Sequence, residues 1–430
     1  MRRAVITGVG AVSAFGFGAG ALFDGLAQGR SAIGPIRSFD CSSFPNQVAG
    51  EVPVTAIDGS WLRAQCGPLG ASEALFDQFS QIGAWRDRKS AFGALAALEA
   101  WRMAGCGAIE QGASLVLALG LEQAFLDDFG PMFAGARIDW QGAVTEPTAA
   151  IRLRSQVDLC ASVVADLLGL RGQVVVNASA CAAGGLAISH AAALIERGAA
   201  SVVLCGGADS MVNPFGMGGM ARLGAPSPCN SFDACRPFDL RRDGLVIGEG
   251  AAMFVLEDEQ RARARGVRIL ARVLGSASTQ DAYRATAPRP DGQFAQRAMA
   301  QAITRAGLAP AQIGYINAHG TGTPLNDVAE ALAIRAVFGA HADVLPVSSI
   351  KGALGHLMAA SGAIEAAACL LALQRDILPG TAHHQQRDPA CDICVIGDTP
   401  MVARVDAVLS NSFGFGGQNV ALILGRGDAS

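Results

Sequence analysis

Short apolar runs alternate along the chain with stretches in which apolar residues recur at helical spacing. The runs predict strands near residues 4–9, 114–119, 173–178, 201–206, 250–256, 268–275, 313–318, 345–349, 404–410 and 418–424. Helices are expected near residues 19–29, 90–104, 158–168, 182–197, 292–306, 326–338 and 357–375. This alternation is typical of an α/β protein with buried, largely parallel strands.

The predicted strands and helices form two series. The order of elements is similar in both, but their amino-acid sequences differ. The second series begins near Arg268, and no low-complexity linker separates it from the first. Because 430 residues exceed the usual size of one compact domain, we expect two similar layered halves, residues 1–265 and 266–430.

The composition and net charge of the chain bear on its binding partners and its cellular compartment. The net charge of −4 gives no reason to expect a nucleic acid or an anionic membrane as partner. Eleven scattered cysteines favour a reducing cytoplasm over a disulfide scaffold. The only CxxC, Cys391 to Cys394, lacks a second ligand pair nearby, so we do not assign it to zinc or redox chemistry.

The first residues superficially resemble an export signal, because Arg2 and Arg3 precede a charge-free run from Ala4 to Phe23. Glycines interrupt this run, so a strand, a glycine-rich turn and a helix are the better interpretation. No other segment approaches 18 apolar residues, and we expect no membrane span.

Four polar, glycine-rich stretches each follow a predicted strand, where open α/β sheets place their sites. They are residues 178–185, 317–327, 348–366 and 411–419. The first carries Cys181 between a strand and a helix. The partial positive charge of a helix N-terminus should lower the pKa of that thiol and favour a nucleophilic thiolate.

The next two stretches supply two histidines and a lysine. His319 and His356 lie in glycine-rich loops beside strand ends, and they suit acid/base work or hydrogen bonding to a developing oxyanion. Lys351 is one of two lysines in a chain that otherwise uses arginine, which points to a need for a compact ammonium. In residues 414–417, GFGG, backbone amides can face a substrate oxygen and Phe415 can gate a cavity.

Taken together, these motifs resemble those of the β-ketoacyl-acyl carrier protein synthases, in particular the elongating synthases I and II and the polyketide ketosynthases. The resemblance runs nearly end to end, through ACAAGG, RPFDLRRDGLVIGEGAA, NAHGTGTPLND, SSIKGALGHLMAASGAIEA and NSFGFGGQN. It implies the thiolase-like fold, with two βαβαβ-type halves in αβαβα layers. It also implies a dimer of identical or similar chains.

The resemblance further implies a decarboxylative Claisen condensation with malonyl-ACP, in fatty acid synthesis or a specialised polyketide or polyene pathway. Cys181 would accept the acyl chain, with its amide and that of Phe415 as oxyanion hole. His319 and His356 would hold the malonyl thioester. The implied supporting residues are Lys351 with Glu365, Asp327 and Glu330 behind the histidine loop, and Thr321 and Thr323 on the pantetheine arm.

No bound cofactor or metal is implied, since phosphopantetheine arrives on an acyl carrier protein. Carrier proteins are acidic, so a basic patch should meet them, and Arg86, Arg88 and Lys89 are the first candidates. Two stretches depart from the fatty-acid enzymes near the expected acyl pocket and dimer contact. One contains Glu122 and Gln123, and the other is RLRSQVD at 152–158.

Three other assignments are weaker. A thiolase would need a second cysteine in the C-terminal glycine-rich loop, and NSFGFGGQN has none. The CoA-primed synthases use an asparagine where this chain has a Cys-His-His arrangement. A non-catalytic chain-length factor would lack the nucleophile, whereas Cys181 and both histidines are present.

Overall fold

The structure is a computed structural model that describes residues 2–54, 56–69, 73–81, 83–107, 112–120, 133–134, 137–138 and 158–428. Its strands are β1 (Ala4–Ser13), β2 (Gly16–Phe17), β3 (Gly34–Pro35), β4 (Val48–Ala49), β5 (Ser114–Leu119), β6 (Phe133–Ala134), β7 (Arg137–Ile138), β8 (Val174–Asn177), β9 (Val202–Ser210), β10 (Glu249–Asp258), β11 (Ala271–Gln280), β12 (Tyr315–Asn317), β13 (Val347–Ser348), β14 (Ile377–Leu378), β15 (Met401–Val402), β16 (Ala407–Gly414) and β17 (Gln418–Arg426).

Its helices are α1 (Ala19–Ala27), α2 (Gly59–Cys66), α3 (Glu73–Gln81), α4 (Arg88–Met103), α8 (Leu159–Leu168), α9 (Ala183–Glu196), α10 (Pro214–Leu223), α11 (Glu259–Ala264), α12 (Gln293–Ala306), α13 (Pro324–Phe338), α14 (Lys351–Leu354) and α15 (Ser361–Arg375). Two 3₁₀ turns, η4 (Ala180–Ala182) and η7 (Met358–Ala360), lie just before α9 and α15. Among the described residues, no helix is long and apolar enough to cross a membrane.

The main sheet contains the same strand order twice. One end runs β8-β5-β9-β10-β1 and the other runs β13-β12-β16-β17-β11, with β1 paired to β11 between them. Numbered within each series, both orders are third, second, fourth, fifth, first. The two series of elements in the sequence therefore fold into two copies of one topology.

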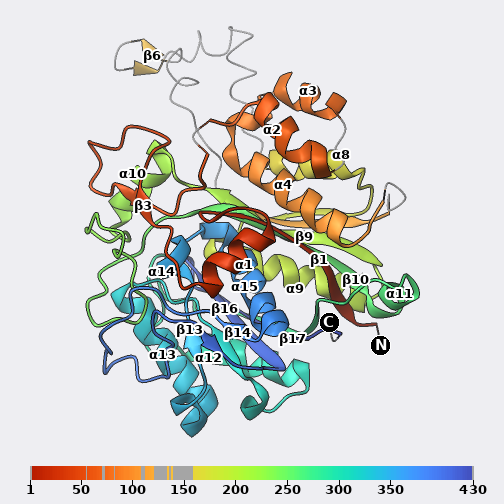
Figure 1. The fold of residues 1–430 in the computed structure, drawn as a ribbon. Coiled ribbons are helices and arrows are strands. Elements are labelled where there is room, and N and C mark those ends of the chain that lie inside the picture. Colours follow the sequence, from red (N-terminus) through yellow and green to blue (C-terminus); the bar gives the residue numbers. More distant parts are fainter. Residues whose placement is uncertain are drawn as a thin grey trace.

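Three helical layers enclose the two parts of the sheet (Figure 1). Helices α4 and α8 cover the outer face of the β8-to-β1 part, and α12 with α13 covers the outer face of the other. Helices α9 and α15 pack against each other and against strands of both parts, which makes them the middle layer. The layered, thiolase-like α/β arrangement is confirmed.

The expectation of largely parallel strands is wrong. Strand β5 pairs in parallel with β8 and β9, and β12 with β13 and β16, but the β1–β10, β9–β10, β11–β17 and β16–β17 pairs are antiparallel. The strands read as continuous apolar runs because helices bury both faces of the sheet. The hydrophobic pattern of the sequence therefore does not distinguish parallel from antiparallel strands.

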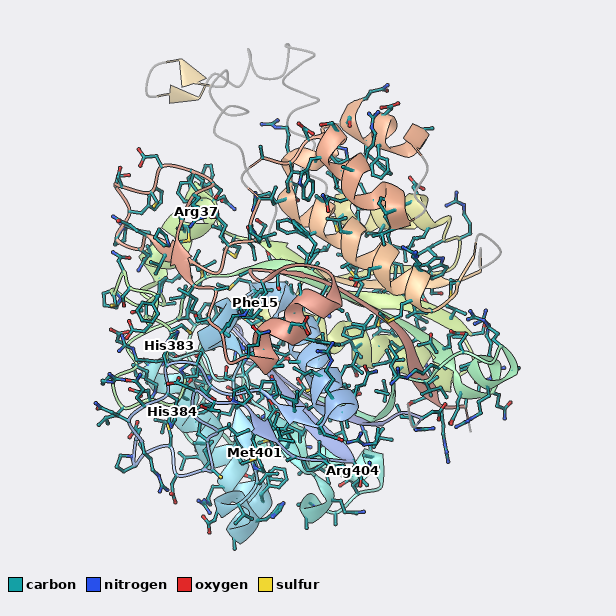
Figure 2. All side chains as sticks on the ribbon, viewed as in Figure 1. Phe15, Arg37, His383, His384, Met401 and Arg404 are labelled. Atoms are coloured by element: carbon teal, nitrogen blue, oxygen red, sulfur yellow. The ribbon has the colours of Figure 1, made fainter. Side chains whose placement is uncertain are left out.

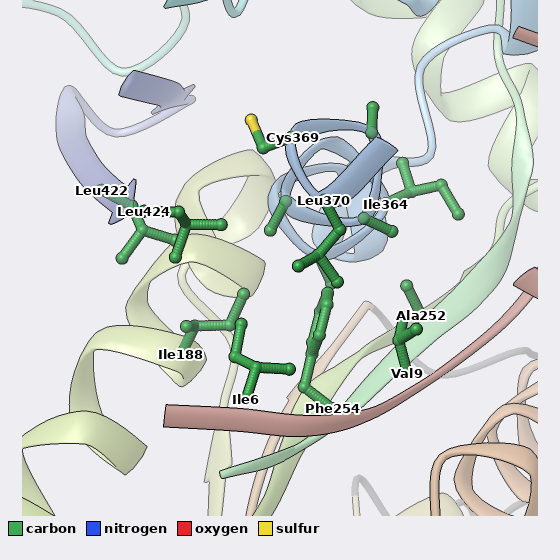
Figure 3. Packing of buried hydrophobic residues seen from close by; sticks show 14 of the residues in the cluster. Ile6, Val9, Ile188, Ala252, Phe254, Ile364, Cys369, Leu370, Leu422 and Leu424 are labelled. Atoms are coloured by element: carbon green, nitrogen blue, oxygen red, sulfur yellow. The ribbon is translucent and has the colours of Figure 1, made fainter. Parts of the chain in front are cut away.

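The central core explains why α9 and α15 lack a polar face. Figure 3 shows the ring of Phe254 of β10 next to Leu370 of α15, with Ile6 of β1 and Ile188 of α9 together on one side of that ring. All four residues are at most 1% exposed. Burying a large side chain contributes about 1.5–3 kcal/mol, so this core holds both helices against the sheet.

Candidate active site

A cavity of about 440 Å³ opens where the carboxyl ends of β8 and β12 meet the β16–β17 turn. Its lining includes Cys181, His319, His356, Phe413 and Phe415. These residues come from all four glycine-rich stretches that the sequence singled out. The structure therefore brings the predicted constellation into one site.

Cys181 lies in η4, between β8 and α9, and is 6% exposed. The turn is tight, since Ala180 has a φ of 46° and a Cβ on Gly184 would come 2.5 Å from the amide nitrogen of Ala363. Small residues are therefore required where the start of α9 meets α15. Cys181 lines the cavity at this point.

The expected lowering of the Cys181 pKa is wrong. Burial raises the pKa of the thiol to about 11, although the Phe415 amide and the Lys351 ammonium oppose that rise. The desolvation cost of a buried thiolate thus exceeds the combined lowering by that hydrogen bond and that cation. The resting side chain is a neutral thiol.

His319 and His356 meet edge to face, with ring centroids 5.3 Å apart. Burial first, and then the Lys351 ammonium, holds the pKa of each imidazole well below its usual value. The amide N–H of Met358 donates to Nδ1 of His356 over 3.0 Å, so the proton of this neutral ring is on Nε2.

Lys351 fixes the other ring. Its Nζ donates to the carbonyl oxygen of His319 over 2.5 Å and approaches Nδ1 of the same residue at 3.3 Å. It also pairs with Glu365, as expected, and both side chains are buried. An ammonium has no lone pair to offer, so Nδ1 of His319 accepts and Nε2 carries the proton.

Two buried carboxylates hold the loop after β12. Glu330 accepts the amides of His319 and Gly320, and Asp327 accepts those of Thr321 and Gly322. Burial raises the pKa of Glu330 to about 7. Four consecutive N–H groups are therefore fixed, which sets the position of the His319 ring.

The remaining predicted residues lie along the cavity. Thr321 and Thr323 line it and hydrogen-bond to each other over 2.8 Å. Phe415 lies in the β16–β17 turn, and its amide hydrogen-bonds to Cys181. A Cβ on Gly414 would come 3.1 Å from the amide nitrogen of Ala182, so this turn packs directly against η4.

The predicted basic surface patch needs correction. Lys89 is 1% exposed and pairs with Asp87 at 3.1 Å. The guanidinium of Arg88 is mostly buried and pairs with Glu249. Only Arg86 of the three is exposed. A run of charged residues in the sequence does not show which of them the fold buries.

Other candidates lie away from the cavity or outside the described residues. His383 and His384 are in the loop before β15 (Figure 2), and His384 lines a separate cavity with Cys391 and Cys394. Among the described residues, no cluster of His, Cys, Asp and Glu could hold a metal. Glu122, Gln123 and residues 152–157 lie outside the described residues.

Sequence reasoning missed Ser361, whose hydroxyl lies 2.8 Å from Nδ1 of His356. It also gave no role to Met358, although its amide binds the same nitrogen. The only signal was their nearness in sequence to His356. The turn that brings both to the ring was not predictable from periodicity.

Comparison with known sequences agrees with this geometry. The chain matches the family "Beta-ketoacyl synthase, N-terminal domain" over residues 1–262 and "Beta-ketoacyl synthase, C-terminal domain" over residues 270–385. A 3-oxoacyl-(acyl-carrier-protein) synthase 2 of Synechocystis sp. is 37% identical, and the match covers 98% of this chain and 97% of that protein.

Two solved structures are similar over 99% of this chain and 99% of their own, each with a TM-score of 0.84. One is the ishigamide ketosynthase/chain length factor, at 32% identity. The other, at 26% identity, is a type II polyketide synthase acyl carrier protein in complex with its ketosynthase bound to the hexaketide. With both family domains matched in order, the chain belongs to the β-ketoacyl synthase family.

Proposed function

We propose that this protein extends an acyl chain held on Cys181 by decarboxylative Claisen condensation with malonyl-ACP. The reaction class, Claisen condensation in fatty acid or polyketide synthesis, is that of its relatives. The observation that carries the residue assignment is that Cys181, His319 and His356 line one cavity.

In the first half-reaction the sulfur of Cys181 attacks the thioester carbonyl of an acyl-ACP. The new S–C bond replaces the bond to the pantetheine sulfur, which leaves and takes up the thiol proton. Backbone N–H groups of Cys181 and Phe415 stabilise the tetrahedral oxyanion. Because the resting group is a thiol with a pKa of about 11, proton loss has to accompany attack.

In the second half-reaction the malonyl thioester carbonyl accepts hydrogen bonds from Nε2–H of His319 and His356. Loss of CO₂ leaves the bonding electrons on the thioester as an enolate, whose oxygen those two donors stabilise. The enolate carbon attacks the acyl-Cys181 carbonyl and a C–C bond forms. The C–S bond to the cysteine breaks, and the thiolate takes up a proton from water. Neutral histidines suit this role, and the lowered pKa values keep both neutral near pH 7.

Thr321 and Thr323 would contact the pantetheine arm, and Phe415 would gate the cavity. Lys351 with Glu365, and Asp327 with Glu330, would hold the histidines in place. We propose that no cofactor resides on the chain, since phosphopantetheine comes with its partner, an acyl carrier protein. Arg86 is the one remaining candidate of the predicted docking patch.

The assembly we propose is a homodimer or a heterodimer with a similar chain, because one neighbour is a ketosynthase/chain length factor.

We place the division of the chain into two halves between residues 265 and 266, which lie between β10 and β11. None of the eleven cysteines forms a disulfide, which supports the cytoplasm as compartment. The unusual Glu122 and Gln123 favour a specialised polyketide or polyene substrate.

A chain-length-factor role is the less favoured alternative, since this chain keeps the thiol and both histidines in one cavity. Intact-protein mass spectrometry separates the two. The protein is incubated with acyl-ACPs from short saturated to long polyunsaturated chains, with Cys181→Ser as control. An acyl mass on the protein but not on the variant, followed by a product two carbons longer with malonyl-ACP, supports catalysis. No loading, alone or with a co-expressed partner chain, overturns it.

A further inference from the structure

Two hydrogen-bond donors converge on one nitrogen of His356. The Met358 amide lies 3.0 Å from Nδ1 and the Ser361 hydroxyl oxygen lies 2.8 Å from it. Ser361 and His356 are each 1% exposed, so water does not compete for these bonds. The reaction mechanism above uses the other nitrogen of this ring, Nε2, and leaves Ser361 without a role.

The direction of the serine bond follows from the amide. A backbone N–H can only donate, so Nδ1 of His356 presents a lone pair and holds no proton. A hydroxyl can donate or accept, but beside a ring nitrogen without a proton it has to donate. The Ser361 O–H therefore points at Nδ1, and the ring receives two donors on the side opposite Nε2–H.

The local fold turns this hydroxyl away from its usual partner. Ser361 is the first residue of α15, and a serine near a helix start commonly caps backbone amides. Here Ala360 is the N-cap residue and makes no side-chain cap bond. Met358 has a φ of 47°, which reverses the chain so that its amide and the Ser361 hydroxyl reach the same ring.

We propose that Ser361 is a positioning residue for the decarboxylation step, fixing His356 as an Nε2–H donor and strengthening that donor. The inference rests on the proposed function. A hydrogen bond to Nδ1 withdraws electron density from the ring, so Nε2–H binds more tightly to an oxygen that is gaining negative charge. The same bond opposes protonation of the ring and opposes the Nδ1–H tautomer.

The two histidines are then fixed by different chemistry. An ammonium, Lys351, approaches Nδ1 of His319, whereas a neutral hydroxyl and an amide bind Nδ1 of His356. Removing the Lys351 charge disturbs both rings, since it lowers the pKa of each. Removing the Ser361 hydroxyl changes one ring only, by one neutral bond, without leaving a buried charge.

The test compares Ser361→Ala with the native protein, with Ser361→Thr, which restores a hydroxyl, and with Ser410→Ala. Ser410 is a matched control because its hydroxyl is also buried, on β16, and hydrogen-bonds to the thiol of Cys369, which has no part in the proposed mechanism. For Ser361→Ala we expect kcat of malonyl-ACP decarboxylation to fall about threefold to tenfold, the range for loss of one hydrogen bond. KM should stay within about twofold, and acyl loading on Cys181 should not change.

Nitrogen NMR of ¹⁵N-histidine-labelled protein gives a readout that a packing defect would not move. The chain has six histidines, and His356→Gln assigns the relevant signals. Losing a donor should shift the Nδ1 resonance of His356 in Ser361→Ala toward that of a free, non-protonated nitrogen. Ser361→Thr and Ser410→Ala should keep the native shift.

Three outcomes overturn the inference: an unchanged Nδ1 shift, an unchanged kcat, or an equal loss of decarboxylation and of Cys181 loading. The last would mean that Ser361 supports the whole site rather than one histidine. Failure of the proposed function looks different, because the native protein itself would then neither load Cys181 nor decarboxylate malonyl-ACP.

Discussion

Replacing Lys351 by methionine should separate the stability of the site from its chemistry. The lysine and its partner Glu365 are 2% and 1% exposed at their side chains, and Lys351 also binds the His319 carbonyl and Nδ1. Lys351→Met keeps the length of the side chain but leaves a buried carboxylate without its cation. Breaking such a pair costs about 3–5 kcal/mol of unfolding free energy.

The double variant Lys351→Met/Glu365→Leu removes both charges. Apolar residues of similar volume often replace a buried ion pair at little cost, so we expect most of the lost stability to return, with a coupling of about 2 kcal/mol or more. Decarboxylation should not return. His319 still lacks the donor that holds its tautomer, and we expect kcat to stay at least about tenfold below that of the native protein.

Urea unfolding followed by circular dichroism gives the free energies, and CO₂ release from malonyl-ACP gives the activity. Acyl loading on Cys181 serves as the control in the double variant, because the lost lowering of the thiol pKa by Lys351 is there opposed by the lost raising by Glu365. Recovery of decarboxylation in step with stability would show that Lys351 only balances Glu365 and does not act through His319. A Lys351→Met variant within about 1 kcal/mol of the native protein would refute the buried-charge argument.

Three further predictions follow from the cavity and its surroundings. Because burial raises the pKa of Cys181 to about 11, its alkylation by iodoacetamide should accelerate about tenfold per pH unit from pH 7 to 10; a plateau near pH 8 would contradict this. Gly414→Ala should slow acyl loading but leave the melting temperature within a few degrees, since its Cβ would press on the Ala182 amide at 3.1 Å; unchanged loading would argue against close packing of the turn on η4. Burial raises the pKa of Glu330 from 4.5 to about 7, so the folded state binds a proton more tightly than the unfolded chain. This contribution to stability is complete below about pH 4.5 and is lost as the pH rises through 7; calorimetry should therefore show a higher melting temperature at pH 5.5 than at pH 8.5, and the reverse order would refute the shift.

The meeting of Cys181, His319, His356 and Lys351 could be predicted because all four follow strands, and α/β sheets place their sites at the carboxyl ends of strands. The strands lie at opposite ends of the main sheet, β8 at one end and β12 and β13 at the other, and the contact between η4 and η7 joins the two halves at the cavity. The hydrophobic periodicity predicts each strand and the residue at which it ends, and the topology of the fold brings those strand ends together. Exposure is a different matter. Lys89 is as charged in sequence as Arg86, and only the packing of α4 on the sheet shows that it is buried.

The errors at Cys181 and the omission of Ser361 have a related cause. A helix N-terminus can be predicted from sequence, but the desolvation that raises the pKa of Cys181 depends on burial by residues far away along the chain. The Ser361 contact depends on the positive φ of Met358, a residue type that rarely adopts it. Neither the desolvation of Cys181 nor the backbone conformation of Met358 can be predicted from a pattern in the amino-acid sequence.

The repeated strand order gives the active site an internal symmetry. In each copy the third strand, β8 or β13, leads through a 3₁₀ turn into the helix of the middle layer, and in the second copy the short helix α14 lies between the strand and that turn. Cys181 comes from this connection in the first copy, and Lys351 and His356 come from the same connection in the second. The two 3₁₀ turns, η4 and η7, contact each other. A doubled unit thus places two versions of one connection face to face, and each version presents a different side chain to the same cavity, the Cys181 thiol from the first copy and the His356 imidazole from the second.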